Sequence, residues 1–148
     1  MKKFEFSLKK LQSYKEQVLK REKNTLSELR KQKQQLIEEM EKLIELRKEK
    51  SNQLEEKIRN GLTPPQVAVH KHFINSIYDK MLNIDLRIDE TEELIQNQLA
   101  LVIEITKEID SINKLEEKQL EEYRKVESKQ QELFIEEFVS HKSFVTSK

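Results

Sequence analysis

The 148-residue sequence contains no cysteine, no tryptophan, one glycine and two prolines. Without cysteine the chain has neither a disulfide framework nor thiolate chemistry. The scarcity of glycine and proline leaves few places for turns, because these residues form most of them. No apolar run approaches the roughly 20 residues of a membrane-spanning helix, and no apolar segment follows Met1-Lys2-Lys3 as it would in a signal peptide. We therefore expect a cytoplasmic protein.

Charged residues make up 38% of the chain and hydrophobic residues 35%, a composition typical of long helices and coiled coils. The apolar residues are regularly spaced, which excludes the disordered class. Basic and acidic residues number 28 each. The basic ones concentrate in residues 1–33 and many acidic ones in residues 89–122, so an antiparallel hairpin would lay the two stretches side by side. This complementarity favours pairing within the chain over binding of nucleic acid.

The segment 60–66, Asn-Gly-Leu-Thr-Pro-Pro-Gln, holds the only glycine and both prolines. Gly61 can adopt the left-handed conformation that ends a helix. Thr63 is a natural N-cap, Pro64 suits the first helical position, and Gln66 completes a capping box with Thr63. The alternative is a kink in one continuous helix. Because stop and start signals follow in the right order, we predict a single domain over residues 1–148 with helices at about 8–59 and 64–139, a turn at 60–65 and a frayed tail at 140–148.

Heptad spacing is clearest in the second predicted helix. Its two seam phases contain Ile74, Met81, Ile88, Ile95, Val102 and Ile109, and His70, Ile77, Ile84, Thr91, Gln98, Ile105 and Ile112. In the first helix, Ile37, Ile44 and Ile58 share one phase and Met40 and Leu54 the matching one, with Lys15, Glu22, Gln32 and Arg47 as interruptions. These patterns predict an all-α, long antiparallel two-helix coiled-coil hairpin. Paired residues should have numbers that add up to about 125.

The second predicted helix is longer than the first by about 36 Å at 1.5 Å per residue. Its C-terminal part should therefore overhang without a partner helix in the same chain. The apolar stripe on this part comprises Leu120, Tyr123, Val126, Leu133, Phe134 and Phe138. Such a stripe calls either for another protein or for self-association of the overhangs into a dimer.

Catalytic patterns are not found in the sequence. One glycine cannot form a phosphate-binding loop, and the paired glutamates are typical of solvated helix faces. The His70-Lys71-His72 segment is a weak metal candidate, because neighbouring helical side chains diverge and no carboxylate or thiolate accompanies them. The basic N-terminal run could bind RNA or an acidic membrane, but a solvated or intrachain charged face is favoured. We expect no enzyme activity, no cofactor and no metal.

Three segments together resemble the flagellar export protein FliJ family: residues 3–11, residues 60–63 with 72–77, and residues 114–123. The resemblance implies an antiparallel coiled coil similar to the stalk of a rotary ATPase gamma subunit. It further implies a non-enzymatic role in the flagellar type III export apparatus, linking the export ATPase hexamer to the membrane export gate FlhA, with export chaperones as further partners. The location implied is the inner face of the cell membrane at the flagellar base, held peripherally through these partners.

The same resemblance suggests two binding surfaces. For the gate it implies a patch after the turn, formed by Phe73, Ile77, Lys80 and Ile84. Lys80 departs from the small or apolar residue expected there, and packing in the seam is the alternative role for Phe73 and Ile77. A stalk would also present the end away from the turn to the ATPase, through Phe4, Phe6, Leu8, Tyr123, Phe134 and Phe138. The alternative function is a prefoldin-like chaperone or scaffold that holds clients by its helix ends.

Overall fold

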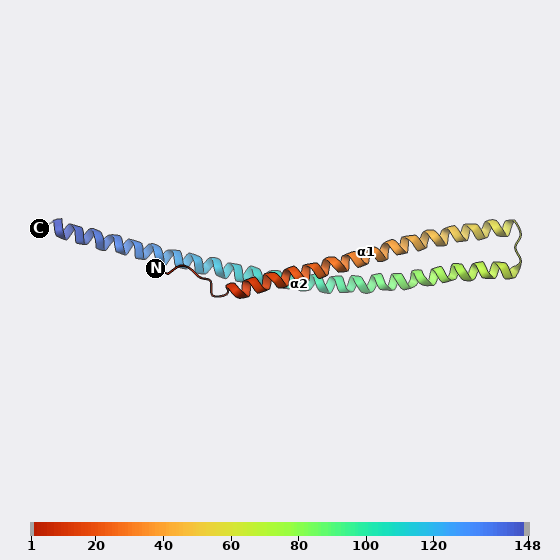
Figure 1. Ribbon diagram of the computed structural model, residues 1–148, viewed down its shortest axis with the longest axis horizontal. Coiled ribbons are helices and arrows are strands. Elements are labelled where there is room, and N and C mark those ends of the chain that lie inside the picture. Colours follow the sequence, from red (N-terminus) through yellow and green to blue (C-terminus); the bar gives the residue numbers. More distant parts are fainter. Residues whose placement is uncertain (1, 147–148) are drawn as a thin grey trace. The chain divides into compact units, whose positions relative to one another are not determined.

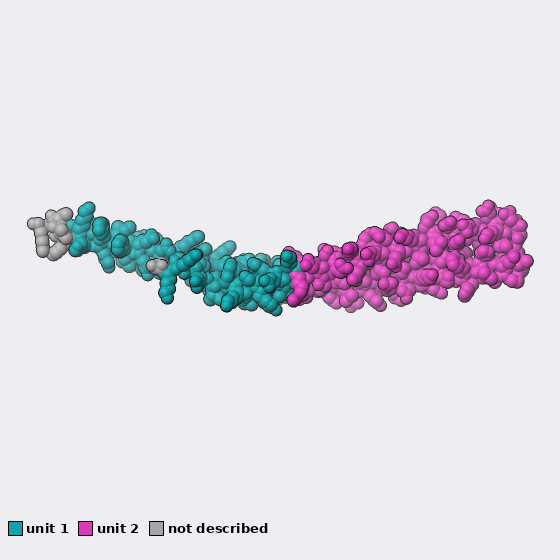
Figure 2. Space-filling model, in the orientation of Figure 1, with its two compact units in different colours: residues 1–20, 103–148 teal, residues 21–102 magenta. Residues whose placement is uncertain are grey.

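The chain forms two long helices joined by one turn (Figure 1). A computed structural model describes the backbone of residues 2–146 and the side chains of residues 2–142. Helix α1 spans Lys9–Arg59 and helix α2 spans Pro64–Thr146, and the described residues contain no strand. The helices pack antiparallel, which confirms the predicted all-α two-helix hairpin. The chain divides into two compact units: unit 1 comprises residues 1–20 and 103–148, and unit 2 comprises residues 21–102 (Figure 2).

The turn has the predicted chemistry. Gly61 has a φ of 100°, and its N–H donates to the carbonyl oxygen of Ile58 at 3.1 Å. The backbone N–H of Thr63 donates to Oε1 of Gln66 at 3.1 Å, which is one half of a capping box. Helix α2 then begins at Pro64, where the missing N–H costs nothing. The turn is therefore fixed by local signals and closes the hairpin without a long loop.

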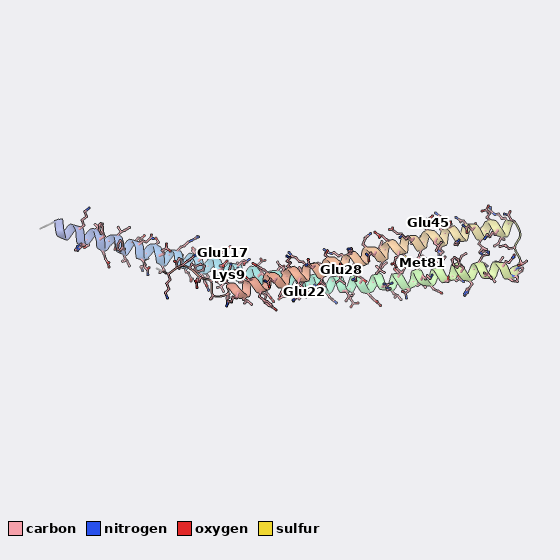
Figure 3. The ribbon with its side chains drawn as sticks, viewed as in Figure 1. Lys9, Glu22, Glu28, Glu45, Met81 and Glu117 are labelled. Atoms are coloured by element: carbon pink, nitrogen blue, oxygen red, sulfur yellow. The ribbon has the colours of Figure 1, made fainter. Side chains whose placement is uncertain are left out.

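The seam of α2 follows the predicted heptads. Every position in the two phases between residues 70 and 112 is buried or half-buried. Ile77 is the most enclosed, with 2% of its surface exposed. In unit 2 the α2 residues face buried Leu26, Leu36 and Leu54 of α1. Figure 3 labels Met81, which belongs to this half-buried series.

One of the two predicted seam phases of α1 is wrong. Met40 is half-buried and Leu54 is buried, as predicted, but the isoleucine phase does not form the seam. Ile44 and Ile58 flank the seam, with 49% and 46% of their surfaces exposed. Lys15 and Glu22, which were expected as polar interruptions of the seam, are half-buried in it together with Lys33. The other expected interruptions, Gln32 and Arg47, are exposed. The three half-buried polar residues find partners on α2, as described below. Burial in α1 therefore follows the partner helix and not the spacing of isoleucine.

The end of α2 also differs from the prediction. The helix continues to Thr146, whereas a frayed tail was expected from residue 140. No glycine or proline follows Pro65, so no residue stops the helix in this region. The part of the expected tail at residues 147–148 lies outside the described residues. Within unit 1, every described side chain from 128 to 142 is exposed, and we call residues 128–142 the overhang.

Candidate partner-binding surfaces

Polar side chains pair across the seam and fix its register. In unit 1, Gln12 Nε2 donates to Asn113 Oδ1 at 2.7 Å. In unit 2, Lys33 Nζ lies 2.6 Å from Glu92 Oε2. The residue numbers of both pairs add up to 125, the predicted register. A cation–π contact of Arg47 with the ring of Tyr78, at 5.6 Å, has the same sum.

Two further pairs show that polar seam residues are matched rather than disruptive. Lys15 Nζ lies 2.6 Å from Glu108 Oε2 in unit 1. Gln98 Nε2 donates to Glu22 Oε2 at 2.7 Å in unit 2. A half-buried charge is costly unless it is paired, so these contacts explain why α1 tolerates lysine and glutamate in its seam. Because these polar side chains are paired with each other, they are not available to bind a ligand in the seam.

Electrostatics at the Lys33–Glu92 pair follow from the geometry. The hydrogen bond from Lys33 lowers the pKa of the Glu92 carboxyl below its ordinary value of 4.5, and a second bond from Gln96 acts in the same direction. Both donors favour the ionised form of the carboxyl group. Glu92 is therefore held as a carboxylate by its neighbours.

The N-terminal segment continues past the start of α1 alongside α2, within unit 1 and in the same antiparallel register (Figure 1). The rings of Phe4 and Tyr123 lie 5.5 Å apart and are tilted by 52°, and the Tyr123 hydroxyl donates to the backbone oxygen of Lys2. Phe6 is buried, with 7% of its surface exposed. Burial raises the pKa of Tyr123, and the nearby Glu127 carboxylate adds to the rise. The segment before α1 is thus a packed part of unit 1.

The six residues predicted to bind the ATPase differ in their exposure. Phe6 is enclosed, Leu8 and Phe4 are half-buried, and Tyr123 contacts Phe4, so these four side chains pack mainly within the chain. Phe134 is 70% exposed, and Phe138 is exposed as well. The six residues therefore do not form one open surface. The prediction placed Phe4 and Tyr123 at the same end of the hairpin but missed that they pack on each other, because no periodic pattern marks residues 2–6.

The overhang carries a group of exposed apolar side chains in unit 1. Five large side chains on it are half exposed or more: Leu133, Phe134, Ile135, Phe138 and Val139. A shallow hollow runs along α2 beside them and is lined by Tyr123, Glu127, Gln130, Gln131, Phe134 and Ile135. The sequence analysis did not identify Ile135 and Val139, because they lie outside the predicted apolar stripe that contains Leu133, Phe134 and Phe138. Exposed apolar side chains gathered in this way mark an interaction surface.

The predicted gate-binding patch is divided by the seam. Ile77 and Ile84 are buried between the helices, as the seam alternative stated for Ile77. Phe73 is 48% exposed, and Lys80 is exposed too. A partner could reach Phe73 and Lys80 but not the two isoleucines. The four residues therefore do not share one accessible face.

A narrow groove lies beside Phe73 in unit 2, with a volume of about 100 Å³. Its lining comprises Lys50, Gln53 and Lys57 of α1 and His70, Phe73 and Ile74 of α2. The groove is smaller than the roughly 300 Å³ at which small-molecule pockets begin, so it fits a side chain rather than a cofactor. Sequence reasoning missed Lys50 and Lys57, although the register of about 125 places this part of α1 opposite the start of α2.

Neither a metal site nor a membrane-spanning helix is found among the described residues. No group of three or more His, Cys, Asp or Glu side chains there is arranged to hold a metal ion. None of the described helical stretches combines the length and the hydrophobicity that crossing a bilayer requires. Comparison of the sequence with protein-family models and with curated proteins, and of the fold with solved structures, finds no match.

Proposed function

We propose that this chain is a non-enzymatic stalk and coupling component of the flagellar type III export apparatus, linking the export ATPase ring to the membrane export gate. The observation that supports the proposal most is the overhang, a helical stretch with exposed side chains throughout and five large apolar ones. A helix of this kind is stabilised when a partner covers its apolar face. The segments that resemble the FliJ family supply the identity of that partner.

The polar seam supports this role. Cross-helix pairs such as Lys15 with Glu108 and Lys33 with Glu92 fix the register of the two helices. Polar seam contacts are a known means of specifying one register at some cost in stability. A fixed register keeps the same side chains exposed on the flanks of each unit. Binding of a specific partner by each unit requires that property.

In this proposal the overhang contacts the ATPase hexamer and Phe73 contacts the gate. The two surfaces belong to different units, unit 1 and unit 2. The chain itself would then be held at the inner face of the cell membrane only through the gate. Export chaperones are further candidate partners of the exposed flanks.

The first prediction tests the ATPase contact. Replacing Phe134 and Phe138 with alanine should weaken ATPase affinity by tens-fold or more, because each buried aromatic ring contributes roughly 1.5–3 kcal/mol before ordering costs. Binding is measured by sedimentation of the purified chain with the ATPase. Lys129→Ala/Glu136→Ala is the matched control, since it changes two exposed polar side chains of the same overhang. A monomeric wild type whose ATPase binding is untouched by the aromatic double change would contradict the proposal.

A prefoldin-like chaperone or scaffold is the second candidate, because exposed apolar side chains near a helix end could also hold unfolded clients. Co-purification separates the two functions. A stalk should recover an ATPase hexamer, whereas a chaperone should recover unfolded clients or sister subunits. Self-association of the overhangs would instead appear as a dimer in the sedimentation of the chain alone.

A further inference from the structure

Lys50 differs from the other lysines of the α1 seam. It is half-buried and occupies the same position of the heptad repeat as Lys15, Leu36 and Leu43. Lys15 and Lys33 each have a glutamate of α2 at 2.6 Å. Among the described residues Lys50 has no ion pair, and its ammonium group donates only to Gln53 Oε1 of its own helix, at 3.4 Å. Its seam position therefore lacks the carboxylate that the others have.

The sequence around the turn explains this difference. No aspartate or glutamate occurs between Glu56 and Asp79, although acidic residues number 28 in the whole chain. The acid-free stretch carries Lys57, Arg59 and Lys71, and it forms the α2 side of the groove beside Phe73. The groove is thus lined by two ammonium groups and one half-exposed aromatic ring, with no carboxylate in its lining.

From this arrangement we infer that the groove beside Phe73 is the docking site for an acidic protein segment. The segment places a carboxylate against Lys50 and Lys57 and packs an apolar side chain on Phe73. A volume of about 100 Å³ suits one side chain. An aromatic ring at the centre of a small contact and charged groups around it are the usual parts of a binding hot spot.

The neighbouring charges favour a short acidic peptide over an extended polyanion. Glu49, Glu55 and Glu56 lie on α1 close to the lysines in sequence and are exposed. These carboxylates repel a nucleic-acid backbone or an anionic membrane, whose charge extends well beyond one groove. A segment with one or two carboxylates beside an apolar residue avoids that repulsion. The inference deepens the gate contact of the proposed function, on which it rests for the identity of the partner, but the docking chemistry stands on the groove alone.

The test selects ligands without any flagellar component. A displayed library of random peptides is panned on the full chain, and the peptides recovered should carry Asp or Glu next to Leu, Ile or Phe. Fluorescence anisotropy then measures the consensus peptide on the wild type, Lys50→Glu, Lys57→Glu and Phe73→Ala. Lys48→Glu is the matched control, because it makes the same charge change at an exposed position of α1. Circular dichroism checks that each variant remains helical, and Lys50→Gln gives a milder second variant.

We expect each groove variant to bind at least about tenfold more weakly, which corresponds to about 1.4 kcal/mol, and the control to bind within about twofold of the wild type. Added salt should weaken the wild-type interaction. Selected peptides that are neutral or basic, or acidic peptides that bind helical groove variants as well as the wild type, would overturn the inference. Tighter binding of a single-stranded oligonucleotide or of phosphatidylserine vesicles to the same residues would overturn it as well. A negative result in the peptide test would not contradict the proposed ATPase contact of the overhang. A negative result in the ATPase sedimentation test would not contradict peptide docking in this groove.

Discussion

At the scale of single residues, Gly61 decides where the hairpin turns. Its φ of 100° lies in a region that residues with a Cβ atom avoid. A Cβ atom built at this position would meet no heavy atom within 4 Å. The need for glycine therefore comes from the backbone conformation and not from crowding. The sequence predicted this role because Gly61 is the only glycine and stands between strong stop and start signals.

Replacing Gly61 with alanine should destabilise the hairpin by about 1–2 kcal/mol, because the left-handed conformation is costly for a residue with a Cβ atom. Urea denaturation followed by circular dichroism gives the free energy of unfolding. Gly61→Asn is the matched comparison and should lose less, since asparagine tolerates this region better. Equal stability of the alanine variant and the wild type would show that the turn can adopt another conformation.

Glu92 provides a pH test at the same scale. The folded chain lowers the pKa of this carboxyl, so the Glu92 carboxylate stabilises the folded state above about pH 4.5 and loses that effect as the pH falls through the lowered pKa. Glu92→Gln should therefore reduce the melting temperature near neutral pH. It should also make the melting temperature fall less steeply as the pH is lowered. Glu90→Gln is the control, because Glu90 is exposed on the same helix. Identical dependence of the melting temperature on pH for all three proteins would show that the Lys33–Glu92 contact does not stabilise the fold.

At the scale of elements, the two helices differ in how much their sequences reveal. The α2 heptads between 70 and 112 were predictable because apolar residues fill most positions. In α1 the phase of Met40 and Leu54 was predictable, but the second phase was not, because it holds Lys15 and Glu22, whose burial depends on partners in α2. Ile44 and Ile58 suggested another phase and are exposed flank residues. A single-helix pattern cannot contain this information, since the pairing is between helices.

The candidate surfaces show the same limit. The exposure of Phe134 and Phe138 was predictable from the helix lengths, because α2 is longer than α1. The burial of Phe6 was not, because residues 2–6 show no periodic pattern and pack against α2 through contacts such as that of Lys2 with Tyr123, more than a hundred residues away in the chain. The groove beside Phe73 likewise needs side chains from both helices. Sites built from one helix can be predicted from its sequence, whereas sites shared by two require the register.

At the scale of the whole molecule, the proposed stalk would engage a different partner with each unit. Unit 1 presents the exposed aromatic rings of the overhang, and unit 2 presents Phe73 beside an unmatched Lys50. A stalk must engage both partners through one chain. The chemistry of the two surfaces differs, since the overhang is mainly apolar and the groove combines an aromatic ring with basic groups. Surfaces of distinct chemistry would allow the proposed stalk to select two partners.

Site-specific photocrosslinking tests this central claim most directly. A photoreactive phenylalanine analogue replaces Phe138 in one sample and Phe73 in another, with Leu86 as an exposed control position in α2. Each full chain is irradiated with the export ATPase and the gate protein together. If the chain is the proposed stalk, position 138 crosslinks to the ATPase, position 73 crosslinks to the gate and position 86 crosslinks to neither. Crosslinks from positions 138 and 73 to the same protein, or from position 138 only to a second copy of this chain, would contradict the proposal.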